Sequence, residues 1–146
     1  EKEEYYKGTE NIEIGKGNVV RDGKDATVIA SGIEVPAALA ASEILEKEGI
    51  RVRVVDMFTV KPLDRELVLQ CAKDTGAIVT AENHNMYGGL GSAVAEVAAE
   101  EARVPFARVG VPDCFGEVGD KAFLAQKFGL TPEHIAEKVK KVIAEK

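Results

Sequence analysis

The run ATVIA at residues 26–30 constrains the fold of this chain more than any other feature. None of its residues carries a charge, and turn-forming pairs flank it at Asp22-Gly23 and Ser31-Gly32. A strand that is apolar along its whole length is buried on both faces, which is typical of parallel sheets covered by helices. We therefore predict that residues 26–30 form a strand of such a sheet.

Helical and strand patterns alternate along the rest of the chain. Pro36 suits the first turn of a helix that Gly49 ends, and Asp64 and Thr131 suit the capping positions of two later helices. The apolar face of the first helix is predicted to hold Ala37, Ala40, Ala41, Ile44 and Leu45. Further strands are predicted at 50–56, 77–82 and 105–111, and further helices at 64–76, about 90–102, 121–128 and from 131 onward. This alternation predicts a parallel sheet with right-handed crossovers and helices on both faces.

An additional edge strand is predicted at Asn18 to Arg21, paired through the turn at Asp22-Gly23. Residues 1–17 are expected to form a linker or arm, and residues 18–146 a single domain. The chain begins at Glu1, without a methionine or a signal segment, and we expect it to be a fragment of a longer chain.

Composition and charge narrow the possible classes of partner. The 146 residues are 45% hydrophobic and 30% charged, and their net charge of −6 opposes binding to nucleic acid or to an anionic membrane surface. No apolar run approaches the ~18 residues that a membrane span requires. Cys71 and Cys114 lack the spacing of a zinc site or a disulfide framework. We expect a cytoplasmic protein without nucleic-acid or membrane partners.

The stretch AIVTAENHNMYGGLGSAVAE at residues 77–96 is the main candidate site. It places Glu82 and His84 at the carboxyl end of a strand, where open α/β sheets bind ligands, and follows them with a glycine-rich turn and a helix. The turn does not match a dinucleotide fingerprint, because Val94 stands where a glycine or alanine is required. Ser92 follows no G-x-S-x-G elbow, so the local sequence contains no evident nucleophile.

Two interpretations of this stretch remain. Amides at the start of the helix, with Ser92 and His84 nearby, could bind an anion. Alternatively, Glu82 accepts hydrogen bonds from those amides and the glycines permit a tight turn, which is the interpretation we favour. We predict no catalytic, cofactor-binding or metal residue, and a candidate interface or anion site formed by Glu82, His84, Gly88, Gly89, Gly91 and Ser92.

Two motifs together resemble a known family. VVDMFTVKPLD at 54–64, followed by AENHNMYGGLGSAVAE at 81–96, resembles the C-terminal domain of transketolase-like thiamine diphosphate enzymes, in particular transketolase and the C-terminal subunit of its split form. The resemblance runs from about Tyr6 to the end of the chain. It implies a three-layer α/β/α fold whose sheet has about five strands, mostly parallel with one antiparallel edge strand.

The resemblance also implies which domains of the complete enzyme bind the cofactor. In such enzymes thiamine diphosphate lies between a pyrophosphate-binding and a pyrimidine-binding domain, and the activating glutamate belongs to the latter. Neither domain is recognisable here, so this chain is expected to bind no cofactor by itself and to be catalytically silent alone. The complete enzyme would use thiamine diphosphate and Mg²⁺, and the partners would be those two domains or subunits, with a homodimer contact in the full assembly.

The expected function is therefore assembly support in a transketolase that transfers two-carbon ketol units between sugar phosphates. The resemblance places Glu82, His84 and the glycine turn at a domain or subunit contact. Arg51 and Arg53 either belong to that contact or line a solvated sheet edge. The alternatives are a docking domain of a 2-oxoacid dehydrogenase decarboxylating component, the C-terminal domain of 1-deoxyxylulose-5-phosphate synthase, and a nucleotide-binding regulatory domain.

Overall fold

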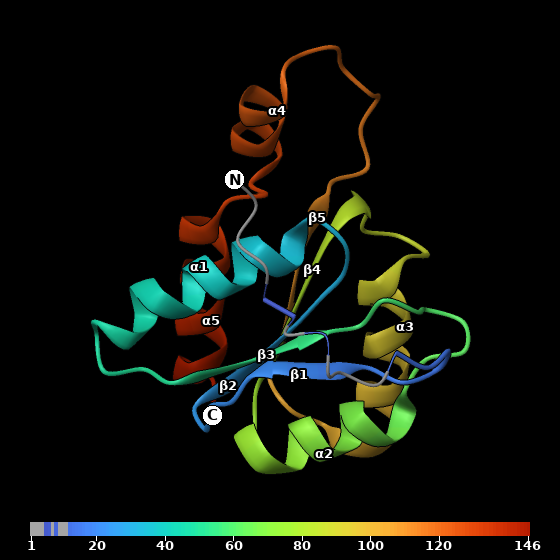
Figure 1. The fold of residues 1–146 in the computed structure, drawn as a ribbon, viewed down its shortest axis with the longest axis vertical. Coiled ribbons are helices and arrows are strands. Elements are labelled where there is room, and N and C mark those ends of the chain that lie inside the picture. Colours follow the sequence, from blue (N-terminus) through green and yellow to red (C-terminus); the bar gives the residue numbers. More distant parts are fainter. Residues whose placement is uncertain (1–4, 7, 9–11) are drawn as a thin grey trace.

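The computed structural model describes residues 5, 6, 8 and 12–146. Its centre is a five-stranded sheet with the spatial order β1-β3-β2-β4-β5 (Figure 1). β1 runs antiparallel to β3, and the other neighbouring pairs are parallel. The strands are β1 (Asn18–Arg21), β2 (Ala26–Ala30), β3 (Val52–Asp56), β4 (Ile78–Asn85) and β5 (Phe106–Val111). The predicted mostly parallel sheet with one antiparallel edge strand is confirmed.

Helices cover both faces of this sheet. One hydrophobic cluster joins the sheet to α1 (Glu34–Glu46) and α5 (Pro132–Ala144). A second cluster on the opposite face joins it to α2 (Arg65–Thr75) and α3 (Leu90–Val97), which continues as a π-helical turn, η1 (Ala98–Ala102). The remaining helix, α4 (Lys121–Phe128), stands beyond the edge where β4 and β5 end (Figure 1). None of the described helices is both long and apolar enough to cross a membrane.

Local signals in the sequence explain most helix ends. The Asp64 carboxylate accepts a hydrogen bond from the Leu67 amide at 3.1 Å and so caps α2. α2 ends at Gly76, whose φ of 68° lies in the left-handed region that favours glycine. α5 begins at Pro132 behind the capping Thr131, as predicted.

The predicted pairing of β1 is wrong, although the strand itself is present. β1 pairs with β3, whereas a turn at Asp22-Gly23 would have paired it with β2. Both edges of β2 are occupied by the parallel strands β3 and β4. The chain after β1 instead passes close to β3, because the amides of Lys24 and Asp25 donate to the Arg51 carbonyl.

The buried face of α1 also differs from the predicted one. Ala41 and Leu45 lie on it, but Ala37, Ala40 and Ile44 are only half-buried. The helix begins at Glu34, ahead of Pro36, and two polar residues share the buried face, which hides its period from an apolar pattern. The buried residues of α1 are Glu34, Val35, Ala38, Ala41, Ser42 and Leu45.

β4 is longer than the predicted strand at 77–82. Its pairing with β5 shifts register after Ala81 and resumes where Asn85 lies opposite Val111. Glu82 and His84 therefore belong to the strand, and the turn begins only after Asn85. The register shift carries β4 outward toward the turn that leads into α3.

Candidate functional site

Glu82 lies at the centre of the candidate site. The residue is 3% exposed, and its carboxylate accepts hydrogen bonds from the amides of Leu90, at 2.7 Å, and Gly91, at 2.8 Å. These amides belong to the first turn of α3, which has a glycine at its capping position and receives no capping hydrogen bond from it. A negative charge is favourable at the positive end of a helix dipole. Glu82 thus occupies two donors that an external anion would otherwise use.

Two glycines are required by the close approach of the turn to Glu82. A Cβ atom on Gly89 would lie 2.1 Å from Glu82 Oε2. A Cβ atom on Gly91 would lie 2.9 Å from both the Thr80 hydroxyl and the Arg108 Cδ. These contacts and the two hydrogen bonds agree with the favoured interpretation, in which the glycines allow the turn to close over a hydrogen-bonded carboxylate.

A second set of contacts braces the outer part of the turn. The Gly88 amide donates to the Ser92 hydroxyl at 2.9 Å, and that hydroxyl donates to the Met86 carbonyl at 3.3 Å. Arg108 donates to the same carbonyl at 2.7 Å, and its guanidinium lies 5.4 Å from the centre of the Tyr87 ring. Sequence reasoning did not find Arg108, which belongs to β5 and has no local signal that links it to the turn.

His84 stands apart from these contacts. Its side chain is exposed, and its Nδ1 atom lies 3.0 Å from the carbonyl oxygen of Asn85. No hydrogen bond joins His84 to Ser92 or Glu82 within the described part of the chain. The structure therefore brings Glu82, Gly89 and Gly91 together and leaves His84 facing solvent.

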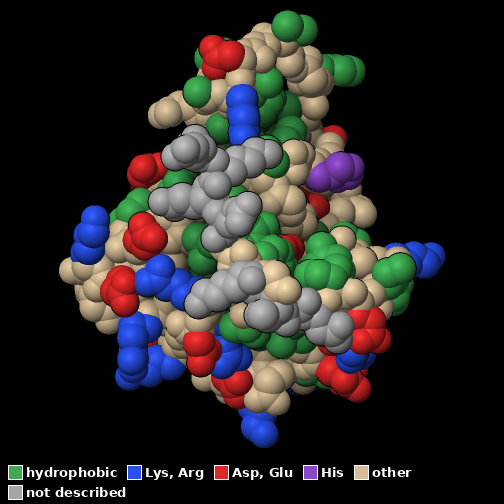
Figure 2. Space-filling view, in the orientation of Figure 1, with side chains coloured by type: hydrophobic (Ala, Val, Ile, Leu, Met, Phe, Trp, Pro, Cys, Tyr) green, Lys and Arg blue, Asp and Glu red, His purple; other side chains and the backbone are tan. Residues whose placement is uncertain are grey.

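Large apolar side chains are exposed on the segments that follow β4 and β5. Tyr87 follows β4, and the loop of residues 112–120 follows β5 and carries Phe115, 97% exposed, and the fully exposed Val118. The two segments start side by side, because the Met86 amide donates to the Val111 carbonyl. Figure 2 shows hydrophobic side chains on the protruding part of the molecule that carries α4. Large exposed apolar side chains are candidates for a protein contact site.

Buried carboxylates in the other motif, VVDMFTVKPLD, hold the segment that precedes β1. Asp56 accepts a hydrogen bond from the Tyr6 hydroxyl at 2.8 Å, and Asp64 accepts one from the Gly17 amide at 3.0 Å. Burial raises the pKa of Asp56, and burial together with this hydrogen bond raises the pKa of Tyr6 to about 12. Of the predicted arm, residues 1–4, 7 and 9–11 lie outside the described residues.

Arg51 precedes β3 and Arg53 lies near its start, at the opposite end of the strand from Asp56. Arg53 forms ion pairs with Asp74, at 2.8 Å, and Asp22, at 2.9 Å, and its guanidinium also contacts the Cys71 sulfur. Arg51 is exposed. Arg53 is thus engaged within the domain, which weakens the case for including it in a contact with another subunit.

Neither cysteine belongs to a group of possible metal ligands in the part of the chain that the structure describes. Cys71 is buried and Cys114 is exposed, and both are free thiols. Within the described ranges, no three His, Cys, Asp or Glu residues are grouped closely enough to hold a metal ion.

Comparison with known proteins gives consistent matches. The family described as "Transketolase, C-terminal domain" matches residues 15–135. The chain is 52% identical over 122 residues to the 6-deoxy-6-sulfo-D-fructose transketolase subunit of Clostridium sp. (strain MSTE9), covering 84% of this chain and 38% of that protein. It is 45% identical over 132 residues to 1-deoxy-D-xylulose-5-phosphate synthase of Syntrophotalea carbinolica, covering 90% of this chain and 21% of that protein.

A solved structure matches both the sequence and the fold. It is described as a split gene transketolase, inactive beta4 tetramer, and superposes with a TM-score of 0.90 at 47% identity, covering 97% of this chain and 46% of that one. The chain thus spans less than half of the length of each relative. Since the family match includes both motifs, the glycine turn and all five strands, the chain belongs to the transketolase C-terminal domain family.

Proposed function

We propose that this chain supports the assembly of a transketolase that transfers two-carbon ketol units between sugar phosphates. The proposal rests on the observation that the buried carboxylate of the candidate site is bonded to the turn of its own domain. The Glu82 carboxylate accepts hydrogen bonds from two amides of α3, while large apolar side chains are exposed on the segments that follow β4 and β5. Such a site is suited to holding a neighbouring domain.

The contact lies on what we call the carboxyl-edge surface, formed by His84, Tyr87, Gly88, Phe115 and Val118. It would face the pyrimidine-binding and pyrophosphate-binding domains or subunits of the same enzyme, and a second copy in a dimer of the full assembly. Thiamine diphosphate and Mg²⁺ would be bound by those other domains. The split gene transketolase that this chain resembles is a tetramer, which supports an assembly role. The free cysteines support a location in the reducing cytoplasm.

Reconstitution with the remaining domains tests this role. Replacing Phe115 and Val118 with serine should weaken association, measured by light scattering after size-exclusion chromatography, without lowering the melting temperature of the chain. His84→Ala should act in the same direction. Ketol transfer should fall only in proportion to the assembled fraction, because the surface holds the domains and does not touch the reacting atoms.

Val19→Thr is the matched control. Val19 is also an exposed apolar residue, but it lies on β1 at the opposite edge of the sheet, and threonine keeps its strand preference. This variant should associate normally. Normal association of His84→Ala combined with a collapsed turnover number would overturn the assembly role and assign His84 to catalysis.

A second candidate is the corresponding domain of 1-deoxy-D-xylulose-5-phosphate synthase, favoured by the 45% identity to that enzyme. The same carboxyl-edge surface would then support a different reaction. Product analysis of the assembled enzyme separates the two, because one reaction yields 1-deoxy-D-xylulose 5-phosphate and the other a ketose lengthened by a two-carbon ketol unit.

A further inference from the structure

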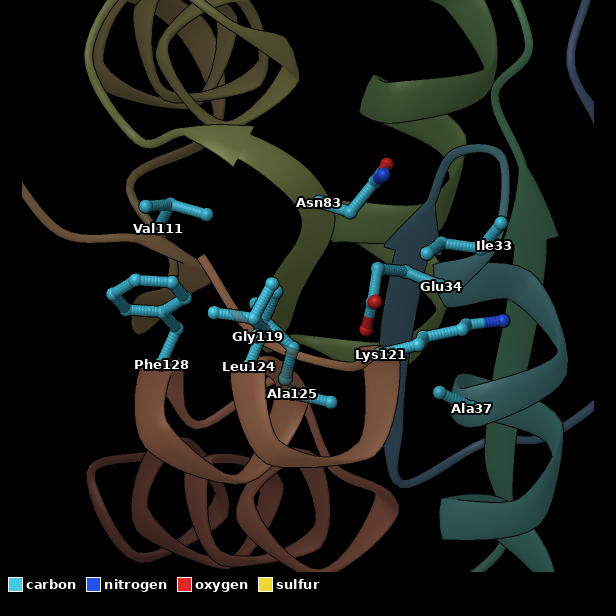
Figure 3. A pocket seen from close by; sticks show the side chains of 11 residues that line it. Ile33, Glu34, Ala37, Asn83, Val111, Gly119, Lys121, Leu124, Ala125 and Phe128 are labelled. Atoms are coloured by element: carbon cyan, nitrogen blue, oxygen red, sulfur yellow. The ribbon is translucent and has the colours of Figure 1, made fainter. Parts of the chain in front are cut away.

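A cavity lies between the start of α1 and the helix α4. Its volume is about 550 Å³, which is within the range of small-molecule sites. The lining is mostly apolar and comes from α1, the end of β5, and α4. Its apolar members include Ile33, Ala37, Val111, Leu124, Ala125 and Phe128 (Figure 3).

The topology of the sheet places this cavity where ligands bind in related architectures. From β2 the chain passes through α1 to β3, which lies on one side of β2. β4 lies on the other side of β2, and from there the chain passes through α3 to β5, farther in that direction. α1 and α3 pack on opposite faces of the sheet. The carboxyl ends of β2 and β4 therefore flank a topological switch point, the usual ligand crevice of open α/β sheets. Glu34 follows β2, Asn83 belongs to β4, and both line the cavity.

Glu34 is the buried acidic residue of this cavity. It is 3% exposed, and its Oε2 atom is buried without a hydrogen-bond partner in the described structure. Figure 3 shows its carboxylate directed into the space between α1 and α4. A buried carboxylate without a partner is costly, and burial raises the pKa of Glu34 to about 7, a rise that the charge of Lys121 opposes. A donor supplied by a ligand would remove this cost.

Lys121 does not supply that donor. It lines the cavity, but it makes no hydrogen bond to the buried Oε2 atom of Glu34, which has no partner among the described residues. In Figure 3 its stem passes the carboxylate and its ammonium group points away. No described residue therefore supplies a donor to the buried Oε2 atom of Glu34.

We propose that this cavity binds a small organic molecule that combines an apolar body with a primary ammonium group, and that the ammonium group donates to Glu34. The apolar body would lie against Leu124 and Phe128. Such a ligand matches both the acidic group and the apolar lining, whereas an inorganic anion matches neither. The site is separate from the proposed assembly role, because none of its lining residues belongs to the carboxyl-edge surface.

Benzylamine and its uncharged counterpart benzyl alcohol are suitable probes. Their binding to the complete assembled protein can be measured at pH 8 by saturation-transfer NMR titration. We expect benzylamine to bind about tenfold more tightly than benzyl alcohol, as for a hydrogen bond between charged groups. Glu34→Gln should abolish this preference and leave benzyl alcohol binding unchanged. Ala125→Leu, which fills part of the cavity, should weaken both probes.

Glu43→Gln is the matched control, since it removes an exposed carboxylate from the same helix. It should leave both affinities unchanged. The proposal is overturned if Glu34→Gln binds benzylamine as tightly as the natural chain, or if the assembly takes up neither probe because another subunit fills the cavity. Both results are independent of ketol transfer, so they leave the proposed function untouched.

Discussion

Replacing Glu82 with alanine should be among the most damaging single changes in this chain. The carboxylate is the acceptor for the Leu90 and Gly91 amides, at 2.7 Å and 2.8 Å, and all three residues are buried. Removing it leaves two amides without a partner and out of reach of bulk water. Each unsatisfied buried donor costs about 1–3 kcal/mol. We therefore expect Glu82→Ala to lower the free energy of unfolding by about 4 kcal/mol.

Urea denaturation followed by circular dichroism measures this loss. Glu82→Gln should lose about half as much, because the carboxamide oxygen can accept from one amide while its NH₂ group faces the other. Glu96→Ala, which removes an exposed glutamate from the same helix α3, should change stability by less than about 0.5 kcal/mol. A loss below about 1 kcal/mol for Glu82→Ala would refute the assigned role of the carboxylate, since that is less than one unsatisfied amide.

Three further changes test other parts of the fold by the same unfolding measurement. Asp64→Ala should cost about 2 kcal/mol, because it removes both the cap of α2 and the acceptor of the Gly17 amide. Gly89→Ala should cost about 1–3 kcal/mol, because the new Cβ would collide with the pinned Glu82 carboxylate. The pKa of Glu34 rises from 4.5 to about 7 on folding, so the folded state holds this proton more tightly and stability falls as the pH rises between those values. Glu34→Gln should remove that decline. At pH 8 its free energy of unfolding should exceed that of the natural chain by about 3 kcal/mol.

Each change has its own control. Asp64→Asn keeps an oxygen that can cap α2 and should recover part of the loss. Gly116→Ala adds a methyl group where no atom lies within 4 Å and should be nearly neutral. Glu43→Gln should retain the pH dependence of the natural chain. Equal stability of Glu34→Gln and the natural chain at pH 8 would contradict the buried, unpartnered state of Glu34.

Sequence reasoning succeeded where neighbouring residues determine the structure. The apolar run of β2, the cap of α2 at Asp64 and the start of α5 behind Thr131 are all specified within a few positions, and each is observed as predicted. The resemblance carried by the two motifs then predicted a mostly parallel sheet with one antiparallel edge strand. For the candidate site, the polar end of β4 was sufficient to predict that Glu82 accepts from the turn amides.

The features that were missed depend on residues far apart in the chain. β1 pairs with β3 because the edges of β2 are already taken, which no local turn signal reveals. Arg108 reaches the turn from β5, so its role appears only when both strands are in place. Glu34 was given no role, because it lies ahead of the helix start predicted at Pro36 and its cavity is completed by α4, far along the chain.

The hydrogen bond from Tyr6 to Asp56 extends the folded unit to a residue that precedes the first strand. Asp56 lies at the end of β3, and its second oxygen is buried without a partner in the described structure. The tyrosine hydroxyl is therefore the donor that offsets the cost of keeping this acid inside the protein. Although Tyr6 precedes the first strand, this bond fastens it to Asp56, near the start of the VVDMFTVKPLD region. This bond therefore anchors Tyr6 at the carboxyl ends of the parallel strands, the end of the sheet at which the glycine turn follows β4.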